Sequence, residues 1–410
     1  YSLDNKWQSL EKRIEPYLDV DGTILAVDTV LHTHRGPTFR ENEDYISMRW
    51  TVLEESGELD ALSTIARAQS VDEWMSGMES WMAPTQNGLV IDRSGNIGIR
   101  SSGRYPVRPK GNLGNVIQDG TMSSSDWIGW LDISEYPGSV NPKQGYLTSS
   151  NQQPVDPAVF DSYLGSDWPP PWRAMQINKL LRSEDVYTIE DLIDFQTHPG
   201  SARADIFVAA FLEARENPNE PLNPNLKQAK TLLMEWDRRY TKNNERAILF
   251  EVAMQKLAEN TWDELKDPQG RMLVRPGSTV LAGLLQTPEN KWWDNQGTEN
   301  LLETRDDILV KSLSEAVEIV SGRYGPAVEG RWQWSRLQTA NIYHLLNIPG
   351  LSALNLPDQG GPETLNPSSG NGRHGASWRM AVEFGDTIIA RGVYPGGQSR
   401  NPLSPSYKNR

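Results

Sequence analysis

The sequence of 410 residues contains no cysteine. This absence excludes disulfides, thiolate metal ligands and cysteine nucleophiles. Histidine is scarce as well, with five in the chain, and of these only His32 and His34 lie close together in sequence. They alternate on an expected strand and share one face, where we interpret them as hydrogen-bonded surface side chains rather than as a metal pair.

Long apolar runs and common enzyme motifs are also missing. No stretch of about 18 or more apolar residues occurs, and the opening residues YSLDNKWQSLEKR are polar, so we expect neither a membrane span nor a signal peptide. The sequence has no phosphate-binding loop, no HExxH zinc motif and no GxSxG nucleophile elbow. Residues 19–22 (DVDG) begin like a calcium loop but lack the later ligands, and we interpret them as a turn.

Acidic residues outnumber basic ones. The chain has 40 Lys and Arg against 54 Asp and Glu, a formal net charge of -14 at pH 7. Such a charge repels nucleic acid and anionic lipid, so neither is an expected partner. The length and a hydrophobic content of 37% predict a globular protein with a full core, built as one large domain or a few smaller ones.

The first part of the sequence predicts mostly β-structure. Residues 23–34 and 45–53 are rich in β-branched and aliphatic side chains, which indicates strands. Residues 89–100 contain two apolar runs separated by a Ser-Gly turn, which predicts a hairpin. A stripe of apolar residues at helical spacing runs from Val71 to Met82, and we assign it to the core rather than to a ligand site.

A long loop and one further strand are expected next. Residues 101–145 are rich in Gly, Pro and Ser, and their Trp127 and Trp130 are expected to dock onto the sheet. Residues 143–154 (KQGYLTSSNQQP) are interpreted as a strand that ends in a polar turn at Asn151.

The later part of the sequence predicts helices and then strands again. Apolar stripes at helical spacing run from about residue 172 to 320. Residues 377–384 and 387–394 alternate as two late strands. Strands at both ends with helices between them predict the α+β class.

Several blocks of the sequence, taken together and in order, carry a family resemblance. They are THRGPTF (33–39), MRW (48–50), QNGLVIDRSGNIGIRSSGRYPVR (86–108), NPKQGYLTSSNQQP (141–154), YLGSDWPPPWRAMQINKLL (163–181), SWRMAVEFGD (377–386) and YPGGQSRNPLSPSY (394–407). These blocks resemble the β-chain of the penicillin acylase family, the bacterial N-terminal nucleophile amidohydrolases that include penicillin, aculeacin and acyl-homoserine-lactone acylases. No single block is specific, but together they cover nearly the whole chain.

The resemblance implies a particular α+β fold. It is the four-layer αββα sandwich of N-terminal nucleophile hydrolases, incomplete in this chain and carrying a large helical insertion. Residues 1–165 would supply sheet and long surface loops, 166–345 the mostly helical region, and 346–410 the returning strands. We expect one intertwined domain rather than separable units.

The resemblance also implies a mechanism and partners. Autocatalytic cleavage of a precursor would expose a serine at the start of the β-chain, and its α-amino group, with a pKa of about 8, would act through a water as base for its hydroxyl. The blocks match a region downstream of that serine, so we expect the nucleophile on the remaining β-chain segment and the α-chain as a second partner. This piece alone is expected to be inactive. The family further implies a periplasmic or secreted protein without a catalytic cofactor.

The matched blocks imply roles for two polar residues. Asn151 falls on the asparagine whose side-chain amide completes the oxyanion hole, and a neutral amide suits that task because it donates without losing a proton. Arg173 falls on the arginine that flanks the nucleophile, where its charge would help to keep the α-amine unprotonated. Read without the resemblance, Asn151 is a turn residue and Arg173 a helix cap or the partner of Asp167.

Further site residues follow from the same resemblance. Gln86 and Asn87 are implied to border the acyl pocket. A structural calcium is implied near the site, with Asp156 and Asp161 as the local candidates. Residues 395–402 (PGGQSRNP) are expected to form a loop of close backbone approach whose glycines serve packing.

Two functions are consistent with the sequence. The first is an amide hydrolase that removes an acyl group from a β-lactam, a homoserine lactone or a lipopeptide, working as a heterodimer cut from one precursor. The alternative is a non-catalytic periplasmic binding or scaffold protein on the same fold, whose tryptophans would stack on a ligand. Trp74 and Trp81 in the helical stripe and Trp50 in a strand argue against the alternative, because these are core positions.

Overall fold

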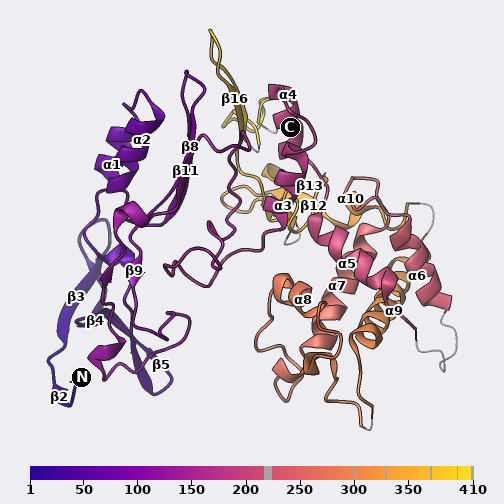
Figure 1. Cartoon of the computed structure of the whole chain (residues 1–410), viewed down its shortest axis with the longest axis horizontal. Helices are drawn as coiled ribbons and strands as arrows, with labels where there is room; N and C mark the ends of the chain where they lie inside the picture. Colours follow the sequence, from indigo (N-terminus) through magenta and orange to yellow (C-terminus); the bar gives the residue numbers. More distant parts are fainter. Residues whose placement is uncertain (217–223, 300, 328–329, 370–371, 395, 408–410) are drawn as a thin grey trace. The chain divides into compact units, whose positions relative to one another are not determined.

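The computed structural model describes residues 1–216, 224–299, 301–327, 330–369, 372–394 and 396–407. The chain divides into two compact units, Tyr1–Pro169 and Pro170–Arg410. The first unit is mostly β-structure, and the second combines a helical core with three β-hairpins (Figure 1). Whether the segments 1–165, 166–345 and 346–410 form one intertwined domain stays a prediction. Residues 370–371, 395 and 408–410 of the last segment lie outside the described residues.

Antiparallel pairing organises the first unit. Its larger sheet has the strand order β3-β4-β5-β6, and a second sheet has the order β11-β8-β7. The strands and helices are β1 (Ser2–Leu3), β2 (Lys6–Trp7), β3 (Glu11–Leu18), β4 (Ile24–Thr33), β5 (Gly36–Glu41), β6 (Asp44–Ser47), α1 (Glu58–Ile65), α2 (Val71–Gly77), β7 (Gln86–Ile91), β8 (Ile97–Ser102), β9 (Pro106–Val107), β10 (Gly129–Trp130) and β11 (Gly138–Val140). The strand expected at residues 23–34 and the hairpin expected at 89–100 are confirmed as β4 and as β7 with β8.

The β7–β8 hairpin has a polar turn and a covered face. In the turn, Asp92 Oδ1 accepts the backbone N–H groups of Ser94 at 2.9 Å and Asn96 at 3.0 Å. Helix α2 packs on the hairpin, and a Cβ on Gly88 would lie 2.3 Å from the Trp74 ring. Glycine at this position therefore allows the indole to rest directly on the strand.

Two expectations for the first unit are wrong in part. The helical stripe ends earlier, because α2 stops at Gly77, although Val71 and Met78 are buried as expected. The strand expected at 45–53 is confirmed only as β6, after which Thr51–Leu53 form a 3-10 turn. Trp130 is the second residue of β10, and its ring packs edge to face on Trp127 with centroids 5.4 Å apart. The docking of these two tryptophans onto the sheet stays a prediction.

The strand expected at residues 143–154 is not formed. Strand β11 ends at Val140, and the next residue, Asn141, has a φ of 46°. Gly145 has a φ of 77°, and its N–H donates to the Pro142 carbonyl in a turn. Left-handed backbone at these two positions interrupts the extended conformation, so the chain reaches Asn151 as a loop.

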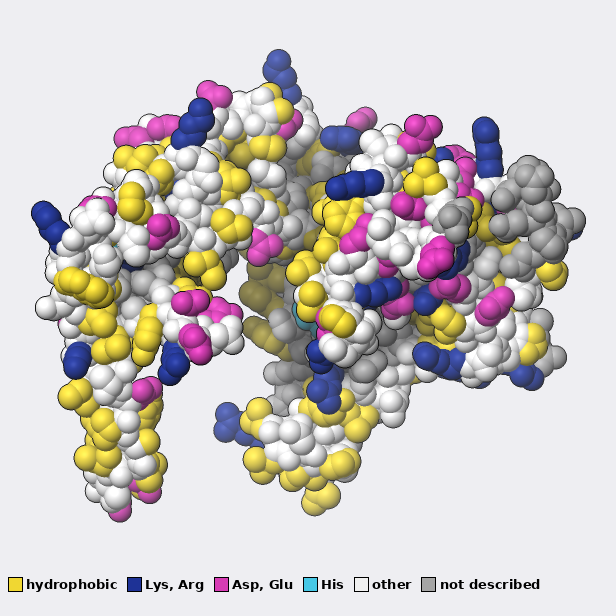
Figure 2. Space-filling view, turned by 90° about the horizontal axis from the view of Figure 1, so that it is seen from below, with side chains coloured by type: hydrophobic (Ala, Val, Ile, Leu, Met, Phe, Trp, Pro, Cys, Tyr) yellow, Lys and Arg dark blue, Asp and Glu magenta, His cyan; other side chains and the backbone are white. Residues whose placement is uncertain are grey.

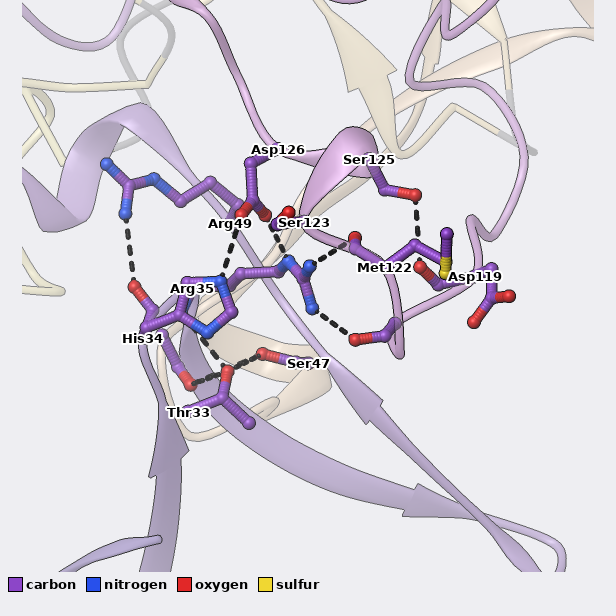
Figure 3. A network of polar contacts seen from close by, with 12 residues as sticks. Thr33, His34, Arg35, Ser47, Arg49, Asp119, Met122, Ser123, Ser125 and Asp126 are labelled. Atoms are coloured by element: carbon purple, nitrogen blue, oxygen red, sulfur yellow. Dashed lines mark hydrogen bonds and ion pairs between the residues drawn. The ribbon is translucent and has the colours of Figure 1, made fainter. Parts of the chain in front are cut away.

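Arg35 connects parts of the first unit that are far apart in sequence (Figure 3). It lies in the turn from β4 to β5, and its guanidinium donates to the Asp126 carboxylate at 2.5 Å, the Gly120 carbonyl at 2.6 Å and the Met122 carbonyl at 2.9 Å. His34 Nε2 lies 3.1 Å from the other Asp126 oxygen. These contacts hold the loop that carries Asp126 against the β4–β5 turn.

The second unit is built on a helical core. Its helices are α3 (Trp172–Leu181), α4 (Ile189–Gln196), α5 (Ala202–Glu213), α6 (Pro224–Met234), α7 (Ala247–Thr261), α8 (Ser278–Leu284), α9 (Arg305–Tyr324) and α10 (Trp334–Leu337). Helices α7 and α9 lie side by side (Figure 1), and their facing residues, such as Leu257 and Leu313, are fully buried. The helical stripe of α9 is confirmed from Leu309 to Val320, whereas Leu302 lies before the helix and is exposed.

A buried ionic group lies inside this helical core. Arg203 on α5 pairs with Glu251 on α7, and the Tyr240 hydroxyl donates to the same carboxylate. Arg203 and Tyr240 are both buried, and burial together with the Glu251 charge raises the pKa of Tyr240 well above its usual value. Removing Arg203 or Glu251 alone would leave the charge of the other without its partner, which is strongly destabilising.

Three β-hairpins complete the second unit. They pair β12 (Thr339–Ile342) with β13 (Ala353–Pro357), β14 (Ser368–Ser369) with β15 (His374–Gly375), and β16 (Arg379–Glu383) with β17 (Ile389–Val393). The last pair confirms the two late strands, and α4 packs against it through a hydrogen bond from Gln196 Nε2 to the Met380 carbonyl at 2.8 Å. Close approach in the loop at 395–402 is confirmed at Gly397, where a Cβ would lie 2.0 Å from the Ser406 carbonyl oxygen, while Pro395 lies outside the described residues.

Among the helices that the structure describes, none is both long and apolar enough to cross a membrane.

Replacing Arg35 tests the Arg35 contacts. We expect Arg35→Ala to lower the free energy of unfolding by about 2 to 3 kcal/mol, because the Asp126 carboxylate and two carbonyls lose their donor. Arg40→Ala is the control, since Arg40 is exposed and donates only to a nearby carbonyl in its own turn; it should change the unfolding energy by less than about 0.5 kcal/mol. Urea unfolding followed by tryptophan fluorescence measures both. Equal stability of the two variants would show that the Arg35 contacts contribute nothing.

The surroundings of His198 predict that the second unit loses stability in acid. Burial, and then the charges of Arg239 and Lys179, lower the pKa of His198 to about 4. The unfolded chain therefore binds more protons than the folded chain between about pH 6.5 and 4, so stability should fall as the pH is lowered through that window. After allowance for solvent screening, we expect a loss of about 1 kcal/mol. Urea unfolding at about pH 7 and 4.5 measures the difference in the free energy of unfolding between the two pH values. His198→Asn should make this difference smaller by about 1 kcal/mol. An equal difference in the variant and the wild type would show that His198 does not cause the acid sensitivity.

Candidate functional site

Asn151 lies at a backbone position that few residue types adopt. It is exposed, and its φ is 69°, in the left-handed region. Asparagine tolerates this conformation better than most non-glycine residues, so the turn role expected from the residues alone is fulfilled. The expected role of Asn151 as an oxyanion donor stays a prediction.

The residues on either side of Asn151 hold each other. Gln152 Oε1 accepts the Ser150 N–H at 2.8 Å and the Ser150 hydroxyl at 2.9 Å. Ser150 is buried, with 7% of its surface exposed. The side chain of Gln152 thus folds back across Asn151 and closes the turn on itself.

The structure brings Asn87 to the same turn. Asn87 is the second residue of β7, and its Nδ2 donates to Ser149 Oγ at 3.0 Å across 62 positions of sequence. Gln86, one residue earlier, begins the strand and is exposed. Of the two residues expected to border the acyl pocket, Asn87 is therefore the one in contact with the turn that presents Asn151. Their role as pocket residues stays a prediction.

Arg173 belongs to the second unit. It is the second residue of α3, whose N-cap is Pro171, so Arg173 does not cap the helix. A cation at the N-terminus of a helix is disfavoured by the helix dipole, by about 0.3 to 1 kcal/mol. The catalytic role of Arg173 stays a prediction.

The two candidate calcium ligands do not make a site by themselves. Asp156 and Asp161 are exposed, and Asp156 Oδ1 already accepts the Ala158 N–H at 2.9 Å in a turn. Within the described part of the chain no three His, Asp or Glu side chains are grouped to hold a metal ion. Because calcium takes 6 to about 8 oxygen ligands, these aspartates would need ligands from elsewhere, and calcium stays a prediction.

Two larger cavities lie away from these residues. One, in the first unit, has a volume of about 800 Å³ and is lined by Arg35, Ser47 and Trp127 among others. The other, in the second unit, has a volume of about 1290 Å³ and includes His344 and His374 in its lining. Neither is lined by Asn87 or Asn151.

Sequence reasoning missed the partners of the candidate residues. In the sequence, Ser149, Ser150 and Gln152 indicate no more than a polar turn, because a run of Ser, Asn and Gln shows no periodicity from which contacts follow. The one available signal is composition, since the six adjacent polar residues 148–153 (TSSNQQ) are more than a simple turn requires.

Comparison with known proteins places the chain among amidases. The family model described as penicillin amidase matches residues 1–410. The acyl-homoserine lactone acylase QuiP of Pseudomonas fluorescens is 26% identical over 439 aligned residues, covering 100% of this chain and 53% of that protein. The penicillin acylase 2 proenzyme of Pseudomonas sp. is 24% identical, covering 86% of this chain and 46% of that protein. The chain thus spans about half the length of these relatives.

A solved structure shows the same fold. The thermostable penicillin G acylase from Alcaligenes faecalis superposes with a TM-score of 0.73 at 18% identity, covering 100% of this chain and 77% of that one. The expected fold of N-terminal nucleophile hydrolases is confirmed by this match, and the family resemblance by the match of the family model over every residue of the chain. The chain belongs to the penicillin amidase family.

Proposed function

We propose that the chain is part of the β-chain of an N-acyl amide hydrolase, and that it supplies the Asn151 carboxamide to the oxyanion hole. The observation that carries the proposal is the match of the whole chain to the penicillin amidase family, combined with the left-handed turn that presents Asn151. The nucleophile is a serine at the amino end of the remaining β-chain segment. A further chain cut from the same precursor completes the enzyme.

The proposed reaction is acyl transfer to serine and then to water. The serine oxygen bonds to the acyl carbonyl carbon while its proton passes to the α-amine, and the carbonyl oxygen gains negative charge. The Asn151 N–H donates to that oxygen more strongly in the tetrahedral state than in the substrate. The C–N bond then breaks, the amine leaves with the proton, and water hydrolyses the acyl ester to a carboxylic acid.

Arg173 has a different part in the proposal. A fixed guanidinium near the α-amine disfavours a second positive charge, so it lowers the pKa of that amine toward the working pH. Its planar set of donors also orders acceptors around the serine. Arg173 therefore affects how the base works, and Asn151 affects the charge on the substrate.

Exposed apolar surface supports a larger assembly. The β3–β4 hairpin leaves Ile14, Leu25 and Val27 more than half exposed, and hydrophobic side chains reach the surface among the charged ones in Figure 2. This hairpin pairs with β5 at residues 32 and 33, near one end, and a pair of strands with apolar side chains in water is marginally stable by itself. The remaining part of the precursor would cover this hairpin and complete the acyl pocket, since the two large cavities exclude Asn87 and Asn151. Processing is supported by the proenzyme name of one relative.

The proposed substrate is an N-acyl homoserine lactone, with N-acyl β-lactams and lipopeptides as the other candidates. The fuller match favours it, because acyl-homoserine lactone acylases cover 100% of the chain against 86% for the penicillin acylase 2 proenzyme. The relatives are bacterial, and a periplasmic or secreted location is part of the proposal.

Replacing Asn151 in the complete enzyme tests the proposal. We expect Asn151→Ala to lower kcat by about 10² to 10³, because the tetrahedral oxygen loses one donor, with KM little changed. Hydrolysis of a chromogenic fatty-acyl or phenylacetyl amide measures it.

A second variant separates the amide from the backbone. Asn151→Gly also removes the carboxamide but accepts a φ of 69° without strain, so it should lose as much activity as Asn151→Ala while melting at the temperature of the wild type. Full turnover in Asn151→Gly would refute the oxyanion role. Complete absence of amide hydrolysis in the wild-type assembly would favour the non-catalytic scaffold instead.

A further inference from the structure

The turn of residues 149–152 is held from two sides. On one side, Asn87 Nδ2 donates to Ser149 Oγ at 3.0 Å. On the other, Gln152 Oε1 accepts two hydrogen bonds from Ser150, at 2.8 and 2.9 Å. Asn151 lies between these contacts, with its left-handed φ of 69°.

The two contacts differ in what they connect. The Gln152 contacts are local and set only the shape of the turn. The Asn87 contact joins the turn to β7, whose residues pair in register with β8, Asn87 opposite Ser101. Strand β11 ends at Val140, so the turn lies beyond the strand pairing of this sheet, and the Asn87 contact is a side-chain link from the turn back to the sheet.

We infer that Asn87 is a positioning residue for Asn151, and that it acts through Ser149. The inference rests on the proposed function and gives Asn87 a role other than contact with the acyl group. Asn87 lies in the paired β7–β8 ladder, and its hydrogen bond to the Ser149 hydroxyl restricts the turn two residues before the proposed oxyanion donor. An oxyanion donor stabilises charge only if it is already in place when the charge develops, so a loosened turn weakens catalysis without removing any catalytic group.

The experiment is a double-mutant cycle in the complete enzyme. Asn87→Ala should lower kcat about 10- to 100-fold, the loss expected for a displacement of about 1 Å, with KM within about twofold of the wild type. When Asn151→Ala is already present, adding Asn87→Ala should lower kcat by less than about twofold, because the side chain that Asn87 positions is already absent.

Ser149 supplies a second, independent measurement. Ser149→Ala removes the hydroxyl and should match Asn87→Ala, whereas Ser149→Thr keeps a hydroxyl and should restore most of kcat. Asn96→Ala is the matched control, an asparagine on the same hairpin whose side chain bonds to Asp92 and Asn141 and not to the 149–152 turn. It should leave kcat within about twofold of the wild type, like other changes away from the site. If Asn87→Ala does not fold, the Ser149 pair decides the question.

The outcomes separate this inference from the proposed function. The inference is wrong if kcat of the double variant falls by the product of the two single losses, because Asn87 would then act independently of Asn151. A change in KM alone would also overturn it and make Asn87 a pocket residue. If Asn151→Ala disables the enzyme while Asn87→Ala and Ser149→Ala are neutral, the inference fails and the proposed function stands. If Asn151→Ala is itself fully active, both fail.

Discussion

The β7–β8 hairpin is the constraint on which the organisation of the first unit depends. Its ladder is regular from Gln86 to Ile91, and three other elements are placed by it. Helix α2 rests on one face because Gly88 leaves room for Trp74, β11 pairs along the edge of β8, and the 149–152 turn is tied to Asn87. The paired strands β7 and β8 thus contact the turn that contains Asn151, the residue that the proposed chemistry needs.

The two units are stabilised by different means. The second has a continuous helical core that encloses the contacts of Arg203, Glu251 and Tyr240. The first has small sheets and exposed apolar strands, and its loops are held by polar contacts such as those of Arg35. A unit with much apolar surface in water gains stability when a partner covers it. The proposed assembly from one precursor would therefore contribute to folding as well as to catalysis.

The proposed chemistry is divided between polypeptides. This chain would contribute a neutral donor for a developing oxyanion and a cation that tunes a neighbouring amine, and both act only on groups that another segment supplies. In this proposal the two candidate residues, at a turn and at a helix start, act on groups outside the chain. If Asn87 positions the turn as we infer, the precision of the proposed oxyanion hole would depend on the contact of Asn87 with Ser149.

Much of the local structure and the family could be predicted from the sequence. Periodicity and turn residues determine local structure, so four features could be predicted: the β7–β8 hairpin, strand β4, the α9 stripe and the late strands β16 and β17. The order of the sequence blocks identified the family and the candidate residues Asn151 and Arg173. Only the tertiary structure decided that residues 143–154 form a loop, because the left-handed backbone of Asn141 and Gly145 depends on the fold around them. It alone also joined Asn87 to Ser149, since a hydrogen bond across 62 positions follows from how strands are placed in space and leaves no periodic trace in the sequence.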